Sequence, residues 1–449
     1  MKIGMYGFSV AVLFATSAFG GVFDKAWIKC TTDREPVSYR RGDTMSFSLT
    51  VQDVDGEFPE GKYFYSWKRT GDDGITETGK APLTKEPFVY ATEIDKPGFV
   101  WLHATVVDSE DKPYPLPDSG KQYASKTLEF NGGAGADVEA IKGMPEPKDF
   151  DEFWQKMRDR LATVPMTSAT VKKVRENDNA EVFAVTIPCA WPRPVTGYVS
   201  IPRRDAKFAA RLTLHGYNVE RRHDPIDPGE GKEIVFDINA HGYELDREDE
   251  YYREFYASVS SGRTVAKSAG DVAVHSATYA FDIDKNSNPN TCYFKGMVYR
   301  VMRALQWLKT QPKWNGKDLI ASGGSQGGLQ TIWAAACGEG VTRAESSITW
   351  GCDFQGTELG RNRGTWYIRY SPGLAYFDAV NAAKRIPKTC MTVVTRAGLG
   401  DYVCPPSGIA AMYNGMTCPK RIHWMQGSTH PYVPPAYDGR DCVRESVTK

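Results

Sequence analysis

The sequence of 449 residues has no excess of either charge, because Lys plus Arg and Asp plus Glu each total 55. A protein that binds nucleic acid or an anionic membrane surface carries a basic surplus, so the balance argues against both partners and fits a neutral polymer better. After the first 20 residues no run reaches the ~20 apolar residues that span a bilayer. Internal repeats and low-complexity tracts are also absent, and 41% hydrophobic content is enough for a large buried core.

Cysteine and histidine are scarce and scattered. The nine cysteines include no Cys-x-x-Cys pair and the seven histidines no His-x-x-x-His spacing, so the sequence predicts no metal site. The wide cysteine spacing does not favour a disulfide framework, and an odd number leaves at least one cysteine unpaired. We expect buried thiols, and neither a metal nor a cofactor.

The chain begins with a segment typical of a secretory signal peptide. Lys2 precedes the apolar residues 8–15, and Ala18 and Gly20 are the small residues expected before cleavage after Gly20. We therefore expect a protein that is secreted or periplasmic. An apolar first strand or a retained anchor is the alternative interpretation.

Changes in residue pattern predict two domains. Residues 24–130 contain short alternating runs rich in aromatic and β-branched residues between Asp-Gly and Pro-Gly turns, which predicts a small immunoglobulin-like β-sandwich. Residues 131–136, Asn-Gly-Gly-Ala-Gly-Ala, are typical of a flexible linker. From residue 137 to 449 strand and helix signals alternate, which indicates an α/β domain with a mostly parallel sheet covered by helices on both faces.

The most informative motif is Gly-x-Ser-x-Gly at residues 323–327. A short apolar run precedes it and helix-prone residues follow, which is the order of a nucleophile elbow. In such an elbow a sharp strand-to-helix turn exposes the serine, and Gly323, Gly327 and Gly328 must be small to let the strand and helix pass closely. We predict Ser325 as a nucleophile, with a plain glycine-rich turn as the alternative.

A serine hydroxyl needs a base within reach and an acid that orients the base, and in this fold both follow the serine along the chain. Of the two histidines after Ser325, His423 lies inside the strand-like residues 420–425, whereas His430 lies in the loop that follows them. We predict His430 as the base. Asp401, at the end of another strand-like run, is the predicted acid, and Asp353 is the alternative.

Attack on an ester carbonyl creates an oxyanion that two backbone amides must face. One amide belongs to the residue after the nucleophile, Gln326, and the other to an early strand-end loop. Residues 214–217 form the candidate loop, so we predict Tyr217 as the second donor and interpret His215 as a hydrogen-bonded anchor. An ordinary strand-end turn is the alternative.

Two longer motifs are distinctive: Gly-Gly-Ser-Gln-Gly-Gly at 323–328 and Gly-Leu-Gly-Asp-Tyr-Val-Cys-Pro-Pro-Ser at 398–407, with weaker landmarks at 147–154 and 215–218. Together they resemble the acetyl xylan esterase and cephalosporin C deacetylase family, carbohydrate esterase family 7, of the α/β-hydrolase superfamily. The resemblance implies an α/β-hydrolase fold without cofactor. It also implies a triad of Ser325, Asp401 and His430, with the amides of Tyr217 and Gln326 as oxyanion hole.

Three features depart from that family. The chain reads His241-Gly242-Tyr243 where the family usually shows Arg-Gly-Gln, and Pro431 follows His430 where glutamate is usual. The amino-terminal sandwich is an addition to the family's single domain, with docking, glycan binding or obstruction of assembly as its candidate roles. The sequence predicts no particular oligomeric state.

The resemblance implies an esterase that removes acetyl groups from acetylated xylan fragments or other acetylated sugars through an acetyl-enzyme, and the segment typical of a signal peptide adds the expectation of export. Two alternatives stay open. A prolyl-oligopeptidase-type peptidase shares the Ser, Asp, His order, but its customary propeller needs more residues than precede the linker. A non-catalytic glycan-binding protein on a hydrolase scaffold is the other.

Overall fold

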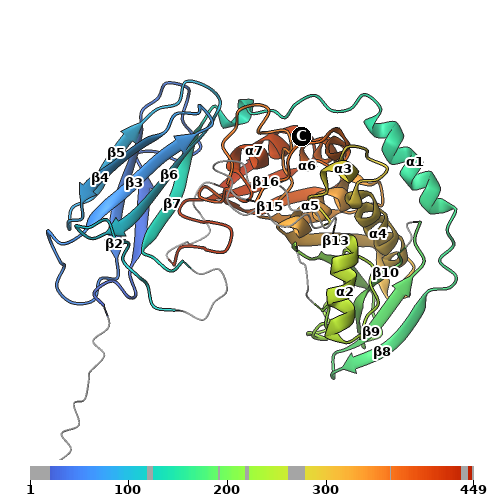
Figure 1. The fold of residues 1–449 in the computed structure, drawn as a ribbon. Helices are drawn as coiled ribbons and strands as arrows, with labels where there is room; N and C mark the ends of the chain where they lie inside the picture. The colour runs from blue at the N-terminus through green and yellow to red at the C-terminus, as the bar shows by residue number, and fades with distance from the viewer. Residues whose placement is uncertain are drawn as a thin grey trace, which may run out of the picture.

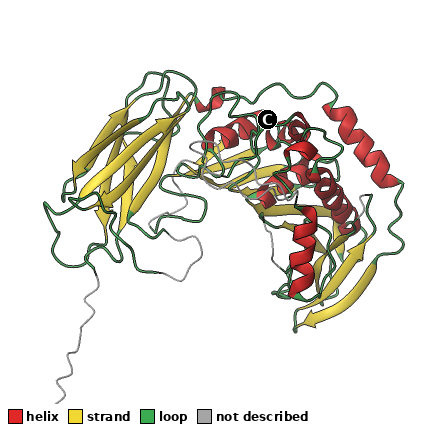
Figure 2. Ribbon diagram, in the orientation of Figure 1, coloured by secondary structure: helices red, strands yellow, loops and turns green. Residues whose placement is uncertain are grey.

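The computed structural model describes residues 21–118, 125–190, 193–217, 222–260, 279–364, 366–435 and, for the backbone, 443–446. Over these residues the chain forms a β-sandwich and a larger α/β domain that meet along one side (Figure 1; Figure 2). The expected signal peptide, residues 1–20, lies outside the described residues. Among the helices that the structure describes, none combines the length and the apolar character needed to cross a membrane.

The sandwich consists of two antiparallel sheets. One has the order β1 (Trp27–Thr32), β2 (Met45–Gln52) and β5 (Phe88–Thr92), and the other β4 (Glu77–Pro82), β3 (Phe64–Gly71), β6 (Gly98–Val107) and β7 (Glu129–Ala136). Alternate residues of β2, namely Met45, Phe47 and Leu49, are completely buried between the sheets. This period of two is the signal that predicted strands from the sequence.

The expected linker, residues 131–136, instead forms the last six residues of the eight-residue strand β7. It pairs antiparallel with residues 98–103 of β6. Neighbouring groups approach closely here: a Cβ on Gly133 would collide with the backbone carbonyl oxygen of Val100, and one on Gly132 would displace the end of the Gln426 side chain. The small residues therefore reflect close packing on both sides of a strand and not freedom of the chain.

The α/β domain is built on a ten-stranded sheet with the order β17-β16-β15-β14-β13-β11-β12-β10-β9-β8. From β12 to β16 neighbouring strands run parallel, and the strands at both ends of the sheet are antiparallel. The predicted mostly parallel sheet is thus confirmed. The strands are β8 (Thr170–Glu176), β9 (Ala180–Ile187), β10 (Val195–Pro202), β11 (Phe208–Leu214), β12 (Ile234–Ile238), β13 (Trp314–Gly324), β14 (Arg343–Ser347), β15 (Met391–Gly398), β16 (Lys420–Met425) and β17 (Val443–Ser446).

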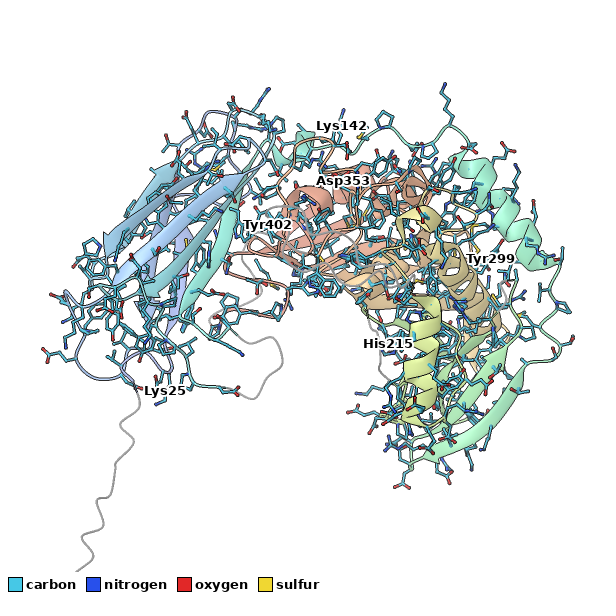
Figure 3. All side chains as sticks on the ribbon, in the orientation of Figure 1. Lys25, Lys142, His215, Tyr299, Asp353 and Tyr402 are labelled. Carbon is cyan, nitrogen blue, oxygen red and sulfur yellow. The ribbon has the colours of Figure 1, made fainter. Side chains whose placement is uncertain are left out.

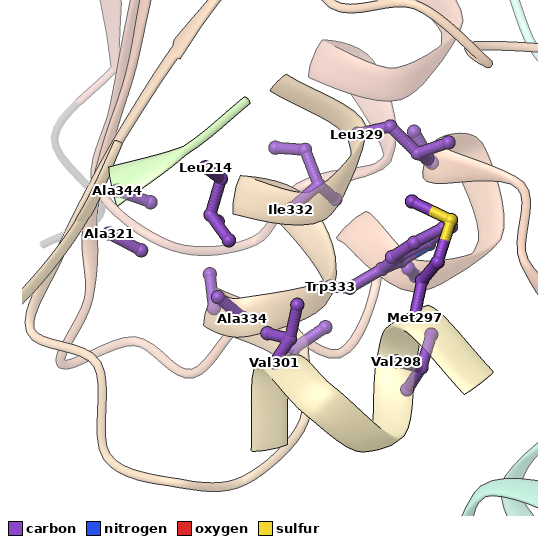
Figure 4. Packing of buried hydrophobic residues seen from close by; sticks show 14 of the residues in the cluster. Leu214, Met297, Val298, Val301, Ala321, Leu329, Ile332, Trp333, Ala334 and Ala344 are labelled. Atoms are coloured by element: carbon purple, nitrogen blue, oxygen red, sulfur yellow. The ribbon is translucent and has the colours of Figure 1, made fainter. Parts of the chain in front are cut away.

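Helices surround this sheet. They are η1 (Val138–Ala140), α1 (Phe150–Ala162), α2 (Asp249–Val259), α3 (Ile283–Asn286), α4 (Tyr293–Leu308), α5 (Gln326–Ala336), η2 (Pro372–Tyr376), α6 (Ala379–Ala383) and α7 (Pro406–Gly415). Of these, α4, α5 and α7 pack directly against the strands of the sheet. Side chains of α4 and α5, among them Val301, Ile332 and Trp333, fill the space beside Leu214 and are completely buried (Figure 4). This packing fixes α5, and with it the turn that joins β13 to α5.

Candidate active site

Ser325 occupies the turn between β13 and α5, which end at Gly324 and begin at Gln326. Its backbone has φ 56° and ψ −121°, a conformation that is strained for any residue but glycine and that a nucleophile elbow requires. Backbone hydrogen bonds hold it there: Ser325 N donates to the Ser347 carbonyl at 2.9 Å, and Trp350 N donates to the Ser325 carbonyl at 3.1 Å.

The small residues around Ser325 are needed for the reason that the motif predicts. A Cβ on Gly323 or Gly327 would collide with the carbonyl oxygen of Leu214 at the end of β11, and one on Gly328 would lie 2.8 Å from Ser346 Oγ. The strand, the helix and the two neighbouring strands therefore pass too closely for a larger side chain.

Asp401 and His430 are in contact, as predicted. His430 Nδ1 lies 3.0 Å from Asp401 Oδ2, and the carboxylate is completely buried while a quarter of the imidazole surface is exposed. The second carboxylate oxygen accepts hydrogen bonds from the amides of Val403 and Cys404, both at 3.1 Å. The acid is thus fixed on both oxygens, and the exposed imidazole is free to face a reactant.

Arg396, near the end of β15, holds the loop that carries His430. The guanidinium of Arg396 donates to the carbonyl of Thr429 at 2.5 Å and also to that of His430. Burial lowers the pKa of this guanidinium from its usual value. Because Arg396 lies on β15 and His430 follows β16, the contact ties two neighbouring strand ends together.

Ser325 and the acid–base pair lie at the same edge of the sheet without a direct hydrogen bond between Ser325 Oγ and His430 among the described residues. Residues 347–348, at the end of β14, link them. Ser325 N donates to the Ser347 carbonyl, and the Ile348 carbonyl accepts from the Cys404 thiol at 3.0 Å. That thiol lies 3.7 Å from His430 Nδ1. Catalytic hydrogen bonds are often long in ligand-free sites and tighten when substrate binds.

The structure gives the two alternative residues other partners. Asp353 is buried in an ion pair with the guanidinium of Arg361, and its labelled side chain is visible in Figure 3. His423 lies within β16, where its backbone pairs with Val443 of β17, and burial lowers the pKa of its imidazole. In the part of the chain described here, neither side chain contacts Ser325.

The predicted oxyanion loop packs directly on the elbow. A Cβ on Gly216 would lie 3.8 Å from Ser325 Cβ, and Gln330 Nε2 of α5 donates to the His215 carbonyl at 3.0 Å. The ring of Tyr217 stacks on that of Tyr279 with centroids 5.2 Å apart, and the Tyr279 hydroxyl donates to the Gln326 side chain at 2.9 Å. Tyr217 and Gln326, the two predicted amide donors, are therefore joined through Tyr279.

His215 is an anchor of this loop. Its Nε2 hydrogen-bonds to Asp237 Oδ1, and His223 Nε2 lies 3.1 Å from the same oxygen. Sequence reasoning missed Asp237 and His223; the position of Asp237 next to the end of a strand was the available signal. The donor atoms of these three residues, and separately those of Asp401, Cys404 and His430, lie within 4.8 Å of one another, as metal ligands would. In both groups, the hydrogen bonds given above explain why the side chains lie close together.

A small recess lies beside the acid loop, next to Val403 and Pro405, and its lining residues do not include Ser325, Asp401 or His430. Aromatic residues line part of it, notably Trp350 and Trp366, and the polar side chains of Arg361 and Asn362 line another part. The Tyr217 ring contacts Trp366 with centroids 5.1 Å apart. The mixture of aromatic and polar groups is typical of ligand pockets.

A model of the acetyl xylan esterase family (AXE1) matches residues 139–365 and 369–442, well over half of the chain. The chain belongs to the acetyl xylan esterase family. The resemblance inferred from the motifs is thus confirmed. The match begins after β7, so the sandwich lies outside the part of the chain that this family shares.

The chain also resembles individual proteins at low sequence identity. Acetyl esterase Axe7A of Xylanibacter ruminicola is 25% identical over 311 residues, which cover 63% of this chain and only 65% of the relative. Among solved structures, an acetyl xylan esterase from Paenibacillus sp. R4 has 21% identity and a TM-score of 0.52, covering 66% of this chain and 94% of that chain. Acetyl xylan esterase 1 from Thermoanaerobacterium sp. JW/SL YS485 has 17% identity and a TM-score of 0.51, with 66% and 93% covered. These likenesses confirm the predicted α/β-hydrolase fold.

Proposed function

We propose that the protein is an exported serine esterase that removes O-acetyl groups from acetylated xylan fragments or other acetylated sugars. One arrangement carries the proposal: buried Asp401 orients His430 at the sheet edge where the strained turn presents Ser325. Membership in the acetyl xylan esterase family supports an acetyl ester as the substrate. The balanced charge of the chain suits a neutral sugar polymer.

In the proposed reaction, Ser325 Oγ attacks the acetyl carbonyl while His430 Nε2 accepts the hydroxyl proton. Asp401 holds Nδ1, which leaves Nε2 as the base and stabilises the imidazolium that forms. The amides of Tyr217 and Gln326 stabilise the oxyanion. His430 then protonates the departing sugar oxygen, and water activated by the same imidazole hydrolyses the acetyl-enzyme to acetate. The recess lined by Trp350 and Trp366 receives part of the sugar.

The decisive test is Ser325→Ala. Acetate release from acetylated xylo-oligosaccharides should fall by on the order of 10⁴-fold or more, because the covalent intermediate can no longer form. The thermal midpoint should change little, since the hydroxyl has no hydrogen-bond partner among the described residues. Ser258→Ala, at an exposed serine of α2, is the matched control and should keep full activity. Undiminished activity in Ser325→Ala would contradict the proposal.

The peptidase alternative predicts cleavage of a proline-site chromogenic peptide. The region before the α/β domain forms a seven-stranded sandwich in the described residues and not a propeller, so we expect no cleavage. Export is tested separately by sequencing the amino terminus of protein recovered from the periplasm or the medium. We expect a chain that starts at Gly21, and a recovered chain that starts at Met1 would contradict the signal peptide.

A further inference from the structure

Both loops of the acid–base pair rest on the amino-terminal sandwich. The loop that ends in His430 begins at Gln426, directly after β16, and the loop that carries Asp401 directly follows β15. Figure 3 places Tyr402, the residue after Asp401, where the two domains meet. The surface of the sandwich at this place is formed by β6 and β7, the strands next to the α/β domain in Figure 1.

The side chain of Gln426 pairs with β7 as a neighbouring strand would. Gly133 N donates to Gln426 Oε1 at 2.9 Å, and Gln426 Nε2 donates to the Gly133 carbonyl at 2.8 Å. Gln426 Oε1 also accepts from Gly427 N at 3.2 Å, inside the His430 loop. One amide group therefore joins the backbone of the sandwich to the backbone of the loop that carries the base.

The Asp401 loop is held by packing. The Tyr402 ring stacks on Trp101 of β6 with centroids 4.1 Å apart and an interplanar angle of 18°. Trp101 is itself oriented by a hydrogen bond from its Nε1 to Asn131 Oδ1 at 3.3 Å. A Cβ on Gly400 would collide with the carbonyl oxygen of Asn131, so the loop lies in backbone contact with β7.

The two loops are also bonded to each other. Gly400 N donates to the Ser428 carbonyl at 3.0 Å, and Leu399 N donates to the Met425 carbonyl at 2.9 Å. A displacement of one loop away from the sandwich must therefore move the other. Catalytic groups need to be held within about 0.5 Å of the productive geometry, and loops reach that precision only when a rigid element supports them.

We infer that the sandwich is a positioning element of the active site. Gln426 and Trp101 are the positioning residues: Gln426 fixes the loop of His430 to the sandwich, and Trp101 fixes the loop of Asp401. The inference rests on the proposed roles of Asp401 and His430. It assigns the added domain a part in acetyl transfer itself, in place of a detachable accessory role. The absence of a side chain at Gly132 then lets Gln426 approach the strand, because a Cβ there would collide with Gln426 Oε1.

Gln426→Ala and Gln426→Glu test the inference. The glutamate keeps the size of the side chain but cannot donate to the Gly133 carbonyl. For p-nitrophenyl acetate, a substrate too small to need the sugar recess, we expect kcat to fall about 10- to 100-fold with KM changed less than about 2-fold, because misplacement by about 1 Å costs on that order. Trp101→Ala should lower kcat about 10-fold, and Trp101→Phe should restore most of it because a stacked ring remains.

Two controls separate positioning from stability. Gln155→Ala, at an exposed glutamine of α1, is the matched glutamine variant, and Val106→Ala lowers the stability of the sandwich core without touching either loop. Both should keep the wild-type kcat at temperatures well below their thermal midpoints. A fall of the midpoint in Gln426→Ala and Trp101→Ala with unchanged kcat would overturn the inference.

Failure of the proposed function is recognised separately. The rate at which a fluorophosphonate labels Ser325 reports the acid–base geometry without any acetylated substrate. If wild-type protein is labelled but releases no acetate from sugars, the substrate assignment fails while the comparison of the Gln426 variants stands. Equal labelling rates in wild type and both Gln426 variants would reject the positioning role.

Discussion

The two sides of the proposed active site are held by different kinds of contact. On the acid–base side, the loops of Asp401 and His430 are fixed by backbone hydrogen bonds and by close packing against β6 and β7. On the oxyanion side, the loop that carries Tyr217 is fixed by the carboxylate of Asp237, which binds two imidazoles, and by stacked rings. Both sides contain a carboxylate–imidazole contact, but only on the oxyanion side does such a contact anchor the loop. Close packing responds to changes of shape, whereas an anchor of this kind responds to protonation. Experiments that change shape or protonation can therefore distinguish the two sides.

The largest effect among the changes to these two sides is expected for Asp401→Asn on the acid–base side. An amide can hydrogen-bond to the imidazole in the wrong tautomer and cannot stabilise the imidazolium, so kcat for acetate release should fall by on the order of 10⁴-fold. The measurement is steady-state kinetics at the pH optimum of the wild type, with circular dichroism to show that the fold is kept.

Asp353→Asn is the matched control for this change. Asp353 forms a buried ion pair with Arg361, so its replacement should lower the thermal midpoint and leave kcat within about 10-fold of wild type, since the residue does not contact His430. If Asp353→Asn lost more activity than Asp401→Asn, the two acids would have to exchange roles.

An intermediate effect is expected for Asp237→Asn on the oxyanion side. The residue acts through His215 and not on the substrate, so kcat should fall about 10-fold, below the 10²- to 10³-fold cost of losing an oxyanion donor itself. KM should change little, and the rate of fluorophosphonate labelling should fall in parallel, because the phosphonyl oxygen occupies the same site. An unchanged kcat would show that Asp237 does not support the oxyanion side of the site.

The same carboxylate should make the oxyanion side sensitive to acid. Burial alone would raise the pKa of Asp237, but hydrogen bonds from His215 and His223 outweigh it and hold the pKa below its usual value. A carboxyl with a lower pKa in the folded state adds stability above its unfolded pKa of about 3.9, and this stability is lost as the pH falls towards the folded value. The difference in thermal midpoint between wild type and Asp237→Asn should therefore be constant near about pH 6 and shrink below about pH 4. A difference that grows in acid would contradict this sign.

The smallest effect is expected for His423→Gln. His423 belongs to β16 and lies outside the two sides compared here, so kcat should stay within about 2-fold of wild type. Burial lowers the pKa of its imidazole, which makes the folded state lose stability as the pH falls below the unfolded value of about 6.5. The glutamine variant should lack this loss. A large fall in kcat would make His423 the base in place of His430.

The sequence predicted more of the acid–base side than of its support. Ser325, Asp401 and His430 could be chosen because each follows a strand-like run, and strand ends in a parallel sheet meet at one edge. The supports of the two sides could not be chosen in this way. His223 belongs to a segment with no motif, the place of Asp237 near a strand end does not show that it binds two histidines, and Gly133 is separated from Gln426 by 293 positions. The composition of residues 131–136 predicts a linker wrongly because glycine-rich residues fit a flexible segment and a closely packed strand equally well.

The sequence by itself determined the alternation of strands and helices, the turn at Ser325 and the order of the acid and the base, because backbone preference and hydrophobic period act over a few neighbouring residues. Only the tertiary structure decided that β7 continues through residue 136, that Asp237 binds two histidines, and that the sandwich supports the loops of Asp401 and His430. Such contacts depend on how two finished surfaces fit together. That fit is a property of packing between distant segments, which no local pattern records.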